Sequence, residues 1–236
     1  MTPLVSCMIV TRDRPGFFRQ ALRCYAAQDY PRKELVVVDD GEQPVGALCD
    51  GIPDVTYVRL KAPTPTGTKM NLAVEIGRGD IVQKFDDDDY YAPGFLSAAV
   101  ARMRRARRPD TLVVACCFAV LIAGEPRLYF SGHGWSAGGS MCFRRALWQR
   151  APFRDVYWST DRFFIQDNEP PIARVCQGDR YVVVRHGLNN WRGIEGYDSV
   201  EGYFRQFRHP RTIRGVVGRA NAAFYRSLKA GAAVGA

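Results

Sequence analysis

Apolar runs of strand length alternate with helical patterns through the first 110 residues of the chain. Continuous apolar runs are typical of central strands in a parallel sheet. Strands and helices that alternate this regularly imply right-handed crossovers, and so an α/β fold with a mostly parallel central sheet that is flanked by helices. The predicted strands lie at 5–11, 35–38, 55–60 and 81–85, and the predicted helices begin near residues 15, 68 and 94.

The alternation ends near residue 110. Strand-like runs at 112–122 and 128–130 follow it, and residues 131–140 are rich in glycine. No internal repeat separates the two parts, so we expect a single domain with a smaller second region. The predicted boundaries are 1–110 for the first half, 111–210 for the second region and 211–236 for a C-terminal helix or tail.

The composition is that of a globular protein, since 47% of the 236 residues are hydrophobic and 24% are charged. No apolar run approaches the roughly 18 residues needed to cross a bilayer, and the N-terminus lacks the pattern of a signal peptide. The seven cysteines are scattered without a Cys-x-x-Cys spacing, so we expect reduced core residues rather than zinc ligands. Together these features predict a cytoplasmic location.

The formal net charge of +9 comes largely from two groups of arginines, at 102–108 and 205–219. The first group lies near a predicted helix end, where cations favour the helix dipole. The second group could contact anionic lipid or a phosphorylated substrate. The segment from residue 212 mixes apolar residues with arginines. It is predicted either to lie on the inner face of a membrane as an amphipathic helix or to pack on the domain or on a second subunit.

Four consecutive aspartates, 86–89, follow directly after the strand at 81–85, and two more, 39–40, follow the strand at 35–38. Ligands of open α/β sheets bind beyond the carboxyl ends of the strands, so one ligand can meet both groups. The acidic run is either a solvated loop or a site at which oxygen ligands hold a divalent cation. Four mutually repelling carboxylates on a buried strand favour the cation site.

Three segments occur in an order and at a spacing that are more specific than any one of them alone. Residues 5–15 join a first strand to a basic loop, and segments 37–41 and 85–89 are acidic. Residues 67–71 add the sequence Gly-x-Lys-x-Asn. Together they resemble the family 2 glycosyltransferases of the GT-A fold, in which 85–89 corresponds to the D-x-D motif. Met70 stands where that family usually has arginine. The resemblance covers about the first 100 residues well and continues more loosely to about residue 192.

The resemblance implies a role for each matching residue. Asp39 would contact the nucleobase, Asp86 would approach the ribose, and Asp88 would bind a metal ion on the diphosphate. Arg12 stands where a tyrosine commonly helps to hold uracil. The residues implied in nucleotide binding are Thr11, Arg12, Asp39, Lys69, Asp86 and Asp87, and those implied in metal binding are Asp88 and His186.

The second region carries the implied base. Residues 138–145 resemble the acceptor-side segment of the family, and 160–164 resemble its E-D-x-x-F motif with threonine in place of the glutamate. Asp161 is therefore the implied catalytic base. The stretch 185–191 is similar to an H-G-x-N-T-W sequence whose histidine lies near the diphosphate or metal. Each assignment has a structural alternative: Asp39 and Asp161 could cap a turn or helix, and His186 could be a hydrogen-bonded core residue.

The implied enzyme is a metal-dependent, inverting glycosyltransferase that uses Mn²⁺ or Mg²⁺. It would transfer a sugar from a nucleotide-sugar donor, with a UDP-sugar as the first choice, to a glycan, lipid-linked or other hydroxyl acceptor in glycan or cell-surface polysaccharide biosynthesis. Residues 1–110 would bind the nucleotide sugar, and 111–210 would bind the acceptor and supply the base.

Two alternatives remain. A sugar nucleotidyltransferase would need a better triphosphate loop than residues 12–16 provide. A degenerate protein of this fold could instead bind nucleic acid or membrane. The carboxylates of 86–89 would repel the phosphate groups of such a partner, so no nucleic-acid partner is expected.

Overall fold

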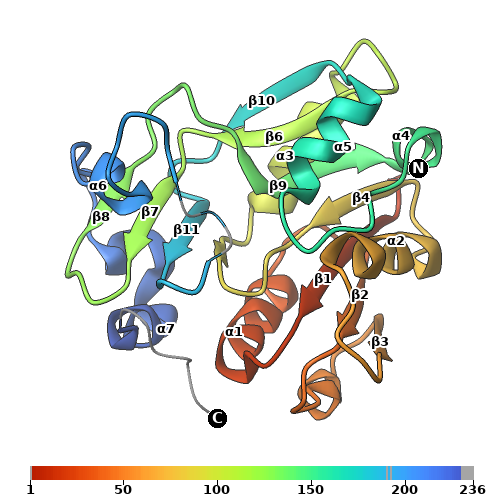
Figure 1. Cartoon of the computed structure of the whole chain (residues 1–236), viewed down its shortest axis with the longest axis horizontal. Coiled ribbons are helices and arrows are strands. Elements are labelled where there is room, and N and C mark those ends of the chain that lie inside the picture. The colour runs from red at the N-terminus through yellow and green to blue at the C-terminus, as the bar shows by residue number, and fades with distance from the viewer. Residues whose placement is uncertain (1, 190, 192, 230–236) are drawn as a thin grey trace.

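The computed structural model describes residues 2–189, 191 and 193–229 (Figure 1). Residues 230–236 of the predicted C-terminal tail lie outside the described residues, as do residue 1 and, within the motif at 185–191, residue 190. Among the described helices, none is long and apolar enough to cross a membrane.

A seven-stranded sheet forms the centre of the fold, in the order β10-β6-β9-β4-β1-β2-β3. Every neighbouring pair is parallel except those of β9, which runs antiparallel to both β4 and β6. The predicted α/β fold with a mostly parallel sheet is thereby confirmed. The strands are β1 (Val5–Thr11), β2 (Lys33–Asp39), β3 (Val55–Arg59), β4 (Ile81–Lys84), β6 (Leu112–Cys116), β9 (Ala137–Arg144) and β10 (Ile172–Cys176).

Helices cover both faces of this sheet, and alternate residues of one strand show why. In β2, Leu35 and Val37 join one hydrophobic cluster with α1 and α3, whereas Val36 and Val38 join a second cluster with α2, α4 and α5. The helix α2 begins two residues before the predicted start at Thr68. The helices are α1 (Pro15–Ala26), α2 (Thr66–Ile76), α3 (Phe95–Arg104), α4 (Arg145–Arg150), α5 (Thr160–Asn168), α6 (Val200–Phe204) and α7 (Ile213–Ser227), with a 3₁₀ turn at Gly46–Cys49.

A second, four-stranded sheet stands beside the first, in the order β5-β11-β7-β8. The apolar run predicted at 112–122 is divided between the two sheets. The chain changes sheet at Cys117, which has a left-handed backbone with φ of 53°. The strands are β5 (Tyr90–Tyr91), β7 (Ala119–Ile122), β8 (Leu128–Phe130) and β11 (Tyr181–Arg185).

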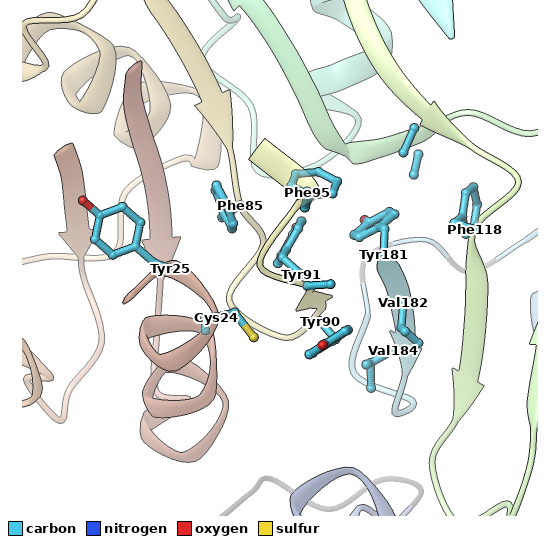
Figure 2. Packing of buried hydrophobic residues seen from close by; sticks show 14 of the residues in the cluster. Cys24, Tyr25, Phe85, Tyr90, Tyr91, Phe95, Phe118, Tyr181, Val182 and Val184 are labelled. Atoms are coloured by element: carbon cyan, nitrogen blue, oxygen red, sulfur yellow. The ribbon is translucent and has the colours of Figure 1, made fainter. Parts of the chain in front are cut away.

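Aromatic side chains fill the junction between the two sheets, beside the connection that joins β4 to β5 (Figure 2). Tyr91 stacks on Tyr181 with ring centroids 5.0 Å apart, and it also contacts Phe85 and Phe95 at 4.4 and 4.8 Å. All four rings are buried. Because Phe85 precedes the acidic loop and Tyr91 follows it, this packing fixes both ends of the loop.

The C-terminal helix α7 packs back onto the domain beside α1 (Figure 1). Gln20 of α1 donates a hydrogen bond to Asn221 over 2.8 Å, and the rings of Phe17 and Phe224 meet edge to face at 6.0 Å. The hydroxyl of the buried Tyr225 donates to the main-chain oxygen of Asp89 at 3.3 Å. Of the two arrangements predicted for this segment, packing on the domain is the one observed for the described part.

Candidate active site

A cavity of about 880 Å³ opens at the carboxyl ends of β1 and β4. This is the edge at which open α/β sheets bind their ligands. The acidic loop 86–89 forms part of the wall, the end of β1 adds Thr11, the β1–α1 loop adds Arg12 and Arg14, and α2 adds Lys69. The opposite parts of the wall come from segments 135–139 and 157–162 and from residues after 180. Residues that are far apart in the sequence therefore face one space.

Asp87 is held by the β1–α1 loop. The hydroxyl of Thr11 donates a hydrogen bond to its Oδ2 over 2.7 Å, and Nη1 of Arg14 lies 3.2 Å from its Oδ1. Thr11 and Asp87 are both buried. Two of the residues predicted to bind nucleotide, Thr11 and Asp87, are thus brought into direct contact, and Arg12 lines the cavity beside them.

Asp88 receives three donors on a single oxygen. Its Oδ2 lies 3.1 Å from Nη1 of Arg14, 2.9 Å from Nε2 of His186 and 3.4 Å from Nδ2 of Asn189. Arg14 also donates from Nη2 to the carbonyl oxygen of Leu188 at 3.1 Å. The motif at 185–191 is therefore tied to the acidic loop through Asp88 and Arg14.

His186 stands behind Asp88 and is 1% exposed. Its ring packs on Phe17 at 4.7 Å, and its buried Nδ1 has no hydrogen-bond partner among the residues that the structure describes. His186 does not line the cavity. This position suits a residue that orients Asp88, and its predicted part as a direct metal ligand stays a prediction.

Asp86 and Asp89 complete the loop. Nζ of the buried Lys84 pairs with Oδ1 of Asp86. Asp89 accepts from the hydroxyl of Tyr181 at 2.6 Å and from the main-chain N–H of Val184 at 2.8 Å. The loop is thus anchored on one side by the central sheet and on the other by β11 of the second sheet.

The acidic loop carries more negative charge than its contacts balance. Burial, followed by the neighbouring carboxylates, raises the pKa of Asp89 well above its usual range. Burial also raises the pKa of Asp86 and Asp87 against the opposing pull of Lys84 and Arg14. Burial alone would raise the pKa of Asp88 too, but the hydrogen bond from His186 and the charge of Arg14 lower it.

The donor set fits a divalent cation. Asp86, Asp88 and Asp89 each offer one carboxylate oxygen, and these three oxygens lie within 4.8 Å of one another. Hard cations prefer such oxygen ligands, and a bound cation would offset both the burial and the repulsion between carboxylates that raise the pKa of Asp86 and Asp89. Asp89 was not singled out from the sequence as a ligand.

The aspartates after β2 lie in a different environment. Asp39 is fully buried and accepts hydrogen bonds from the N–H groups of Gly41 and Val45 and from the hydroxyl of Tyr57, at 2.8, 3.0 and 2.8 Å. It does not line the cavity, whereas its neighbour Asp40 does. Capping of the following turn, the alternative considered for Asp39, is the contact observed, and the nucleobase role stays a prediction.

Lys69 lines the cavity but is already paired. Its Nζ lies 2.6 Å from Oδ1 of Asp40 and 3.4 Å from the carbonyl oxygen of Thr11. Both charged groups are buried. Since Thr11 contacts Asp87 as well, the chain Asp40–Lys69–Thr11–Asp87 connects the ends of β2, α2, β1 and β4.

Asp161 reaches the same cavity from the first turn of α5. A Cβ atom on Gly138 of β9 would lie 2.0 Å from its Oδ2, and one on Gly139 would lie 2.4 Å from Oδ2 of Asp86. These two glycines are therefore needed for the carboxylates to approach β9. No hydrogen-bond donor to the carboxylate of Asp161 is found among the described residues, so it does not act as a helix cap. Its charge contributes to the raised pKa of Asp86.

Three further residues that line the cavity were not predicted from the sequence as site residues. Arg14 and Lys84 make the ion pairs of the acidic loop. A lysine two residues before Asp86 in a buried strand is a usable signal, because only a paired lysine is buried in this way. Trp158 also lines the cavity, three residues before Asp161. For Arg14 the sequence offers no comparable signal.

Solved structures with the same fold include glycosyltransferases. S. aureus TarS, residues 1–349, in complex with UDP-GlcNAc is 17% identical, with a TM-score of 0.63 over 77% of this chain and 58% of that one. The mannosyltransferase PcManGT from Pyrobaculum calidifontis, in complex with GDP-Man and Mn²⁺, is 18% identical, with a TM-score of 0.58 over 80% of this chain and 59% of that one. At these identities the likeness shows the GT-A fold.

Two curated relatives match part of the chain. WcaA of Escherichia coli (strain K12), whose name places it among glycosyl transferases of colanic acid biosynthesis, is 29% identical over 110 residues, which are 44% of this chain and 39% of WcaA. The uncharacterized glycosyltransferase RT0329 of Rickettsia typhi is 23% identical over 130 residues, 55% of this chain and 41% of RT0329. The match thus spans about two fifths of each relative.

The family itself follows from a longer match. The sequence model of the family described as Glycosyl transferase family 2 matches residues 6–161, which begin in β1 and end at Asp161. The matched region therefore contains the acidic loop and Asp161, which line the same cavity. The chain belongs to glycosyl transferase family 2.

Proposed function

We propose that this chain is a metal-dependent, inverting glycosyltransferase that transfers a sugar from a nucleotide-diphosphate sugar to a hydroxyl acceptor. The observation that carries the proposal is the shared cavity: the acidic loop 86–89 and Asp161, far apart in the sequence, line one space. The loop offers oxygen ligands for a cation, and Asp161 offers a carboxylate that accepts no hydrogen bond from the described residues.

The donor half of the cavity would hold the nucleotide diphosphate. Asp86, Asp88 and Asp89 would hold a divalent cation, Mn²⁺ or Mg²⁺, which when bound supplies Lewis-acid stabilisation of the leaving diphosphate. Arg14 contacts Asp87 and Asp88 through one guanidinium nitrogen. It lies where it can offset further negative charge.

Asp161 would accept the proton of the attacking hydroxyl. The acceptor oxygen must lose this proton as it bonds to the anomeric carbon, and a single displacement of this kind inverts that carbon. Asp161 is half-buried and lines the cavity, so it is accessible to a bound acceptor. The lysine that faces Asp86, Lys84, also feels the charge of Asp161. The positive charge of Lys84 therefore acts on both carboxylates.

The direct test is Asp161→Asn, with Asp167→Asn as the matched control on the same helix. Asp167 pairs with Arg154 outside the cavity. Loss of a general base lowers kcat by about 10²–10⁴-fold, whereas the control should keep full activity. Both variants should retain nucleotide-induced thermal stabilisation. An Asp161→Asn enzyme with unchanged kcat would contradict the assignment.

For the donor, we propose a UDP-sugar. This choice rests on the family resemblance and on the UDP-GlcNAc complex of TarS, while PcManGT binds GDP-Man. Arg12, at the position discussed for a uracil-binding tyrosine, lines the cavity and is a candidate to contact the base. Thermal stabilisation by UDP-, GDP- and dTDP-sugars with Mn²⁺ tests the choice, because the preferred donor should give the largest shift.

The acceptor side of the proposal is broader. Residues 1–110 would bind the donor, and residues 111–210 would bind the acceptor and supply the base. The name of WcaA supports a place in cell-surface polysaccharide biosynthesis. We retain contact with the inner face of a membrane through the C-terminal segment as part of the proposal. Arg214 and Arg219 of α7 are exposed and available for such contact.

A further inference from the structure

One of the four tryptophans takes no part in the hydrophobic core. Trp135 and Trp191 pack on the larger core cluster, and Trp148 packs on the smaller one. Trp158 belongs to neither cluster among the described residues and is 66% exposed. An indole is a large apolar group that proteins seldom leave in water without a use. Folding does not account for Trp158.

Trp158 lines the active-site cavity together with its neighbour Tyr157, which is 42% exposed. Their ring centroids lie 5.9 Å apart. Asp161 follows three residues later and faces the same space. Two exposed aromatic rings therefore line the same cavity as the proposed base.

The main chain beneath these rings is fixed. The hydroxyl of Thr66 donates to the carbonyl oxygen of Tyr157 at 2.7 Å, and the N–H of Gly67 donates to that of Val156 at 3.0 Å. Both donors belong to the first turn of α2, the helix that carries Lys69. Exposed side chains on an anchored backbone are the property of a binding surface rather than of a frayed loop.

The turn between Trp158 and Asp161 is strained. Ser159 has a left-handed backbone with φ of 57°, which is uncommon for a residue other than glycine, asparagine or aspartate. Such strain persists where the surrounding structure enforces it and is concentrated at functional sites. The strained residue joins the exposed indole to the helix of the base.

The rest of the acceptor side combines aromatic faces with hydrogen-bonding groups. Trp135 and Trp191 contact each other at 5.2 Å and both line the cavity. Ser136, Ser159 and Asn189 line it as well. A pyranose ring has an apolar C–H face and a rim of hydroxyl groups, so it matches this mixture. A polyprenyl chain needs a continuous apolar groove, and the polar residues beside Trp158 interrupt one.

We propose that Trp158 and Tyr157 form an acceptor platform for a hexopyranose residue, so that the attacking hydroxyl belongs to a saccharide. The inference rests on the proposed function and narrows its acceptor from any hydroxyl compound to a sugar. Trp158 provides the face on which the ring stacks. The position of Asp161, three residues later, brings the base to the rim of the same ring.

Saturation-transfer NMR tests the platform without requiring turnover. The probes are methyl glycosides of glucose, galactose, mannose and N-acetylglucosamine at millimolar concentration, added to the wild type. At least one glycoside should receive saturation from the protein. Trp158→Ala should weaken its binding by about tenfold, which corresponds to about 1.4 kcal/mol, and Trp158→Phe should restore part of the loss. Phe207→Ala, which removes another exposed ring outside the cavity, should change nothing.

Three results would overturn the inference. In the first, the wild type binds none of the glycosides. In the second, the wild type and Trp158→Ala bind a glycoside equally well. In the third, the protein binds vesicles that contain polyprenyl phosphate, in a manner that depends on Trp158, and does not bind the sugars. A melting curve of each variant guards against unfolding. Titration of the same wild-type sample with UDP and GDP in Mn²⁺ separates the two claims. If neither UDP nor GDP binds while a glycoside still binds, the proposed function is contradicted. If a nucleotide binds while no glycoside binds, the platform is contradicted.

Discussion

The aspartates after β2 and those after β4 look alike in the sequence but occupy opposite electrostatic situations. Asp39 receives three hydrogen bonds from its own neighbourhood, and Asp40 is matched by the buried Lys69. The loop 86–89 gathers four carboxylates, which contact Arg14, Lys84 and His186 in the described part of the chain. We call Asp39 and Asp40 the balanced pair, because neighbouring donors or a lysine compensate each carboxylate. We call residues 86–89 the overloaded loop, because its carboxylates outnumber the cationic side chains that contact them.

The difference shows how structure and function divide between two similar motifs. A buried carboxylate whose donors are all supplied locally holds a turn in place. A group of carboxylates whose pKa is raised by burial and by one another's charge costs stability until it binds a cation or a proton. Of the balanced pair, Asp40 lines the cavity with its charge already paired to Lys69, whereas the overloaded loop presents carboxylate oxygens that a cation could bind.

The largest effect on stability should come from the balanced side. Asp39→Ala would leave the N–H groups of Gly41 and Val45 and the hydroxyl of Tyr57 without their acceptor. We expect a loss of about 3 kcal/mol in the free energy of unfolding, measured with urea. Asp50→Ala, at an exposed aspartate, is the control and should stay within about 0.5 kcal/mol of wild type. A loss below about 1 kcal/mol for Asp39→Ala would contradict the structural role.

A substitution in the overloaded loop should raise the stability of the protein, whereas Asp39→Ala lowers it. The pKa of Asp89 is raised well above its ordinary 3.8 by burial, so the folded protein binds this proton more tightly than the unfolded chain. Stability from this group is therefore present at low pH and declines as pH rises from the unfolded toward the folded pKa. Asp89→Asn removes that decline. In EDTA at neutral pH the variant should be more stable by about 1 kcal/mol.

Thermal unfolding of both proteins across pH measures this difference. The gap between Asp89→Asn and wild type should widen as pH rises and close as pH falls toward the ordinary carboxyl range. A gap that is independent of pH would show that the pKa of Asp89 is the same in the folded and the unfolded protein, and would contradict this account.

The smallest effect concerns one hydrogen bond of the balanced side. Tyr57→Phe removes the hydroxyl that donates to Asp39 at 2.8 Å and keeps two other donors. Burial, aided by this bond, raises the pKa of Tyr57 to about 12. A loss of about 1 kcal/mol in the free energy of unfolding is expected. Tyr197→Phe, at an exposed tyrosine, should leave the free energy of unfolding unchanged. Equal losses in Tyr57→Phe and Tyr197→Phe would show that the hydrogen bond to Asp39 does not stabilise the protein.

The strand ends could be read from the sequence, because apolar runs followed by aspartates place carboxylates at one edge of a parallel sheet. Local patterns do not specify which partner reaches each carboxylate. The pairing of Lys69 with Asp40, and of Arg14 with Asp87 and Asp88, depends on side chains that meet only after folding. The same limit hid the difference between Asp39 and Asp40 at the cavity wall.

The second sheet was equally hidden. The run 112–122 reads as one strand-rich segment, whereas the left-handed Cys117 divides it between two sheets. Asp89 gains its donors, Tyr181 and Val184, from that second sheet. Its part in the donor set could not be predicted without the break.

The central claim is that the overloaded loop serves as a cation site for a nucleotide diphosphate. Isothermal titration of Mn²⁺ into the protein with UDP present tests it most directly, on wild type and on Asp88→Asn, which keeps the shape and removes one charge. The account predicts saturable Mn²⁺ binding by wild type and at least about tenfold weaker binding by Asp88→Asn. Equal Mn²⁺ affinity in the two proteins, or UDP binding that needs no cation, would contradict it.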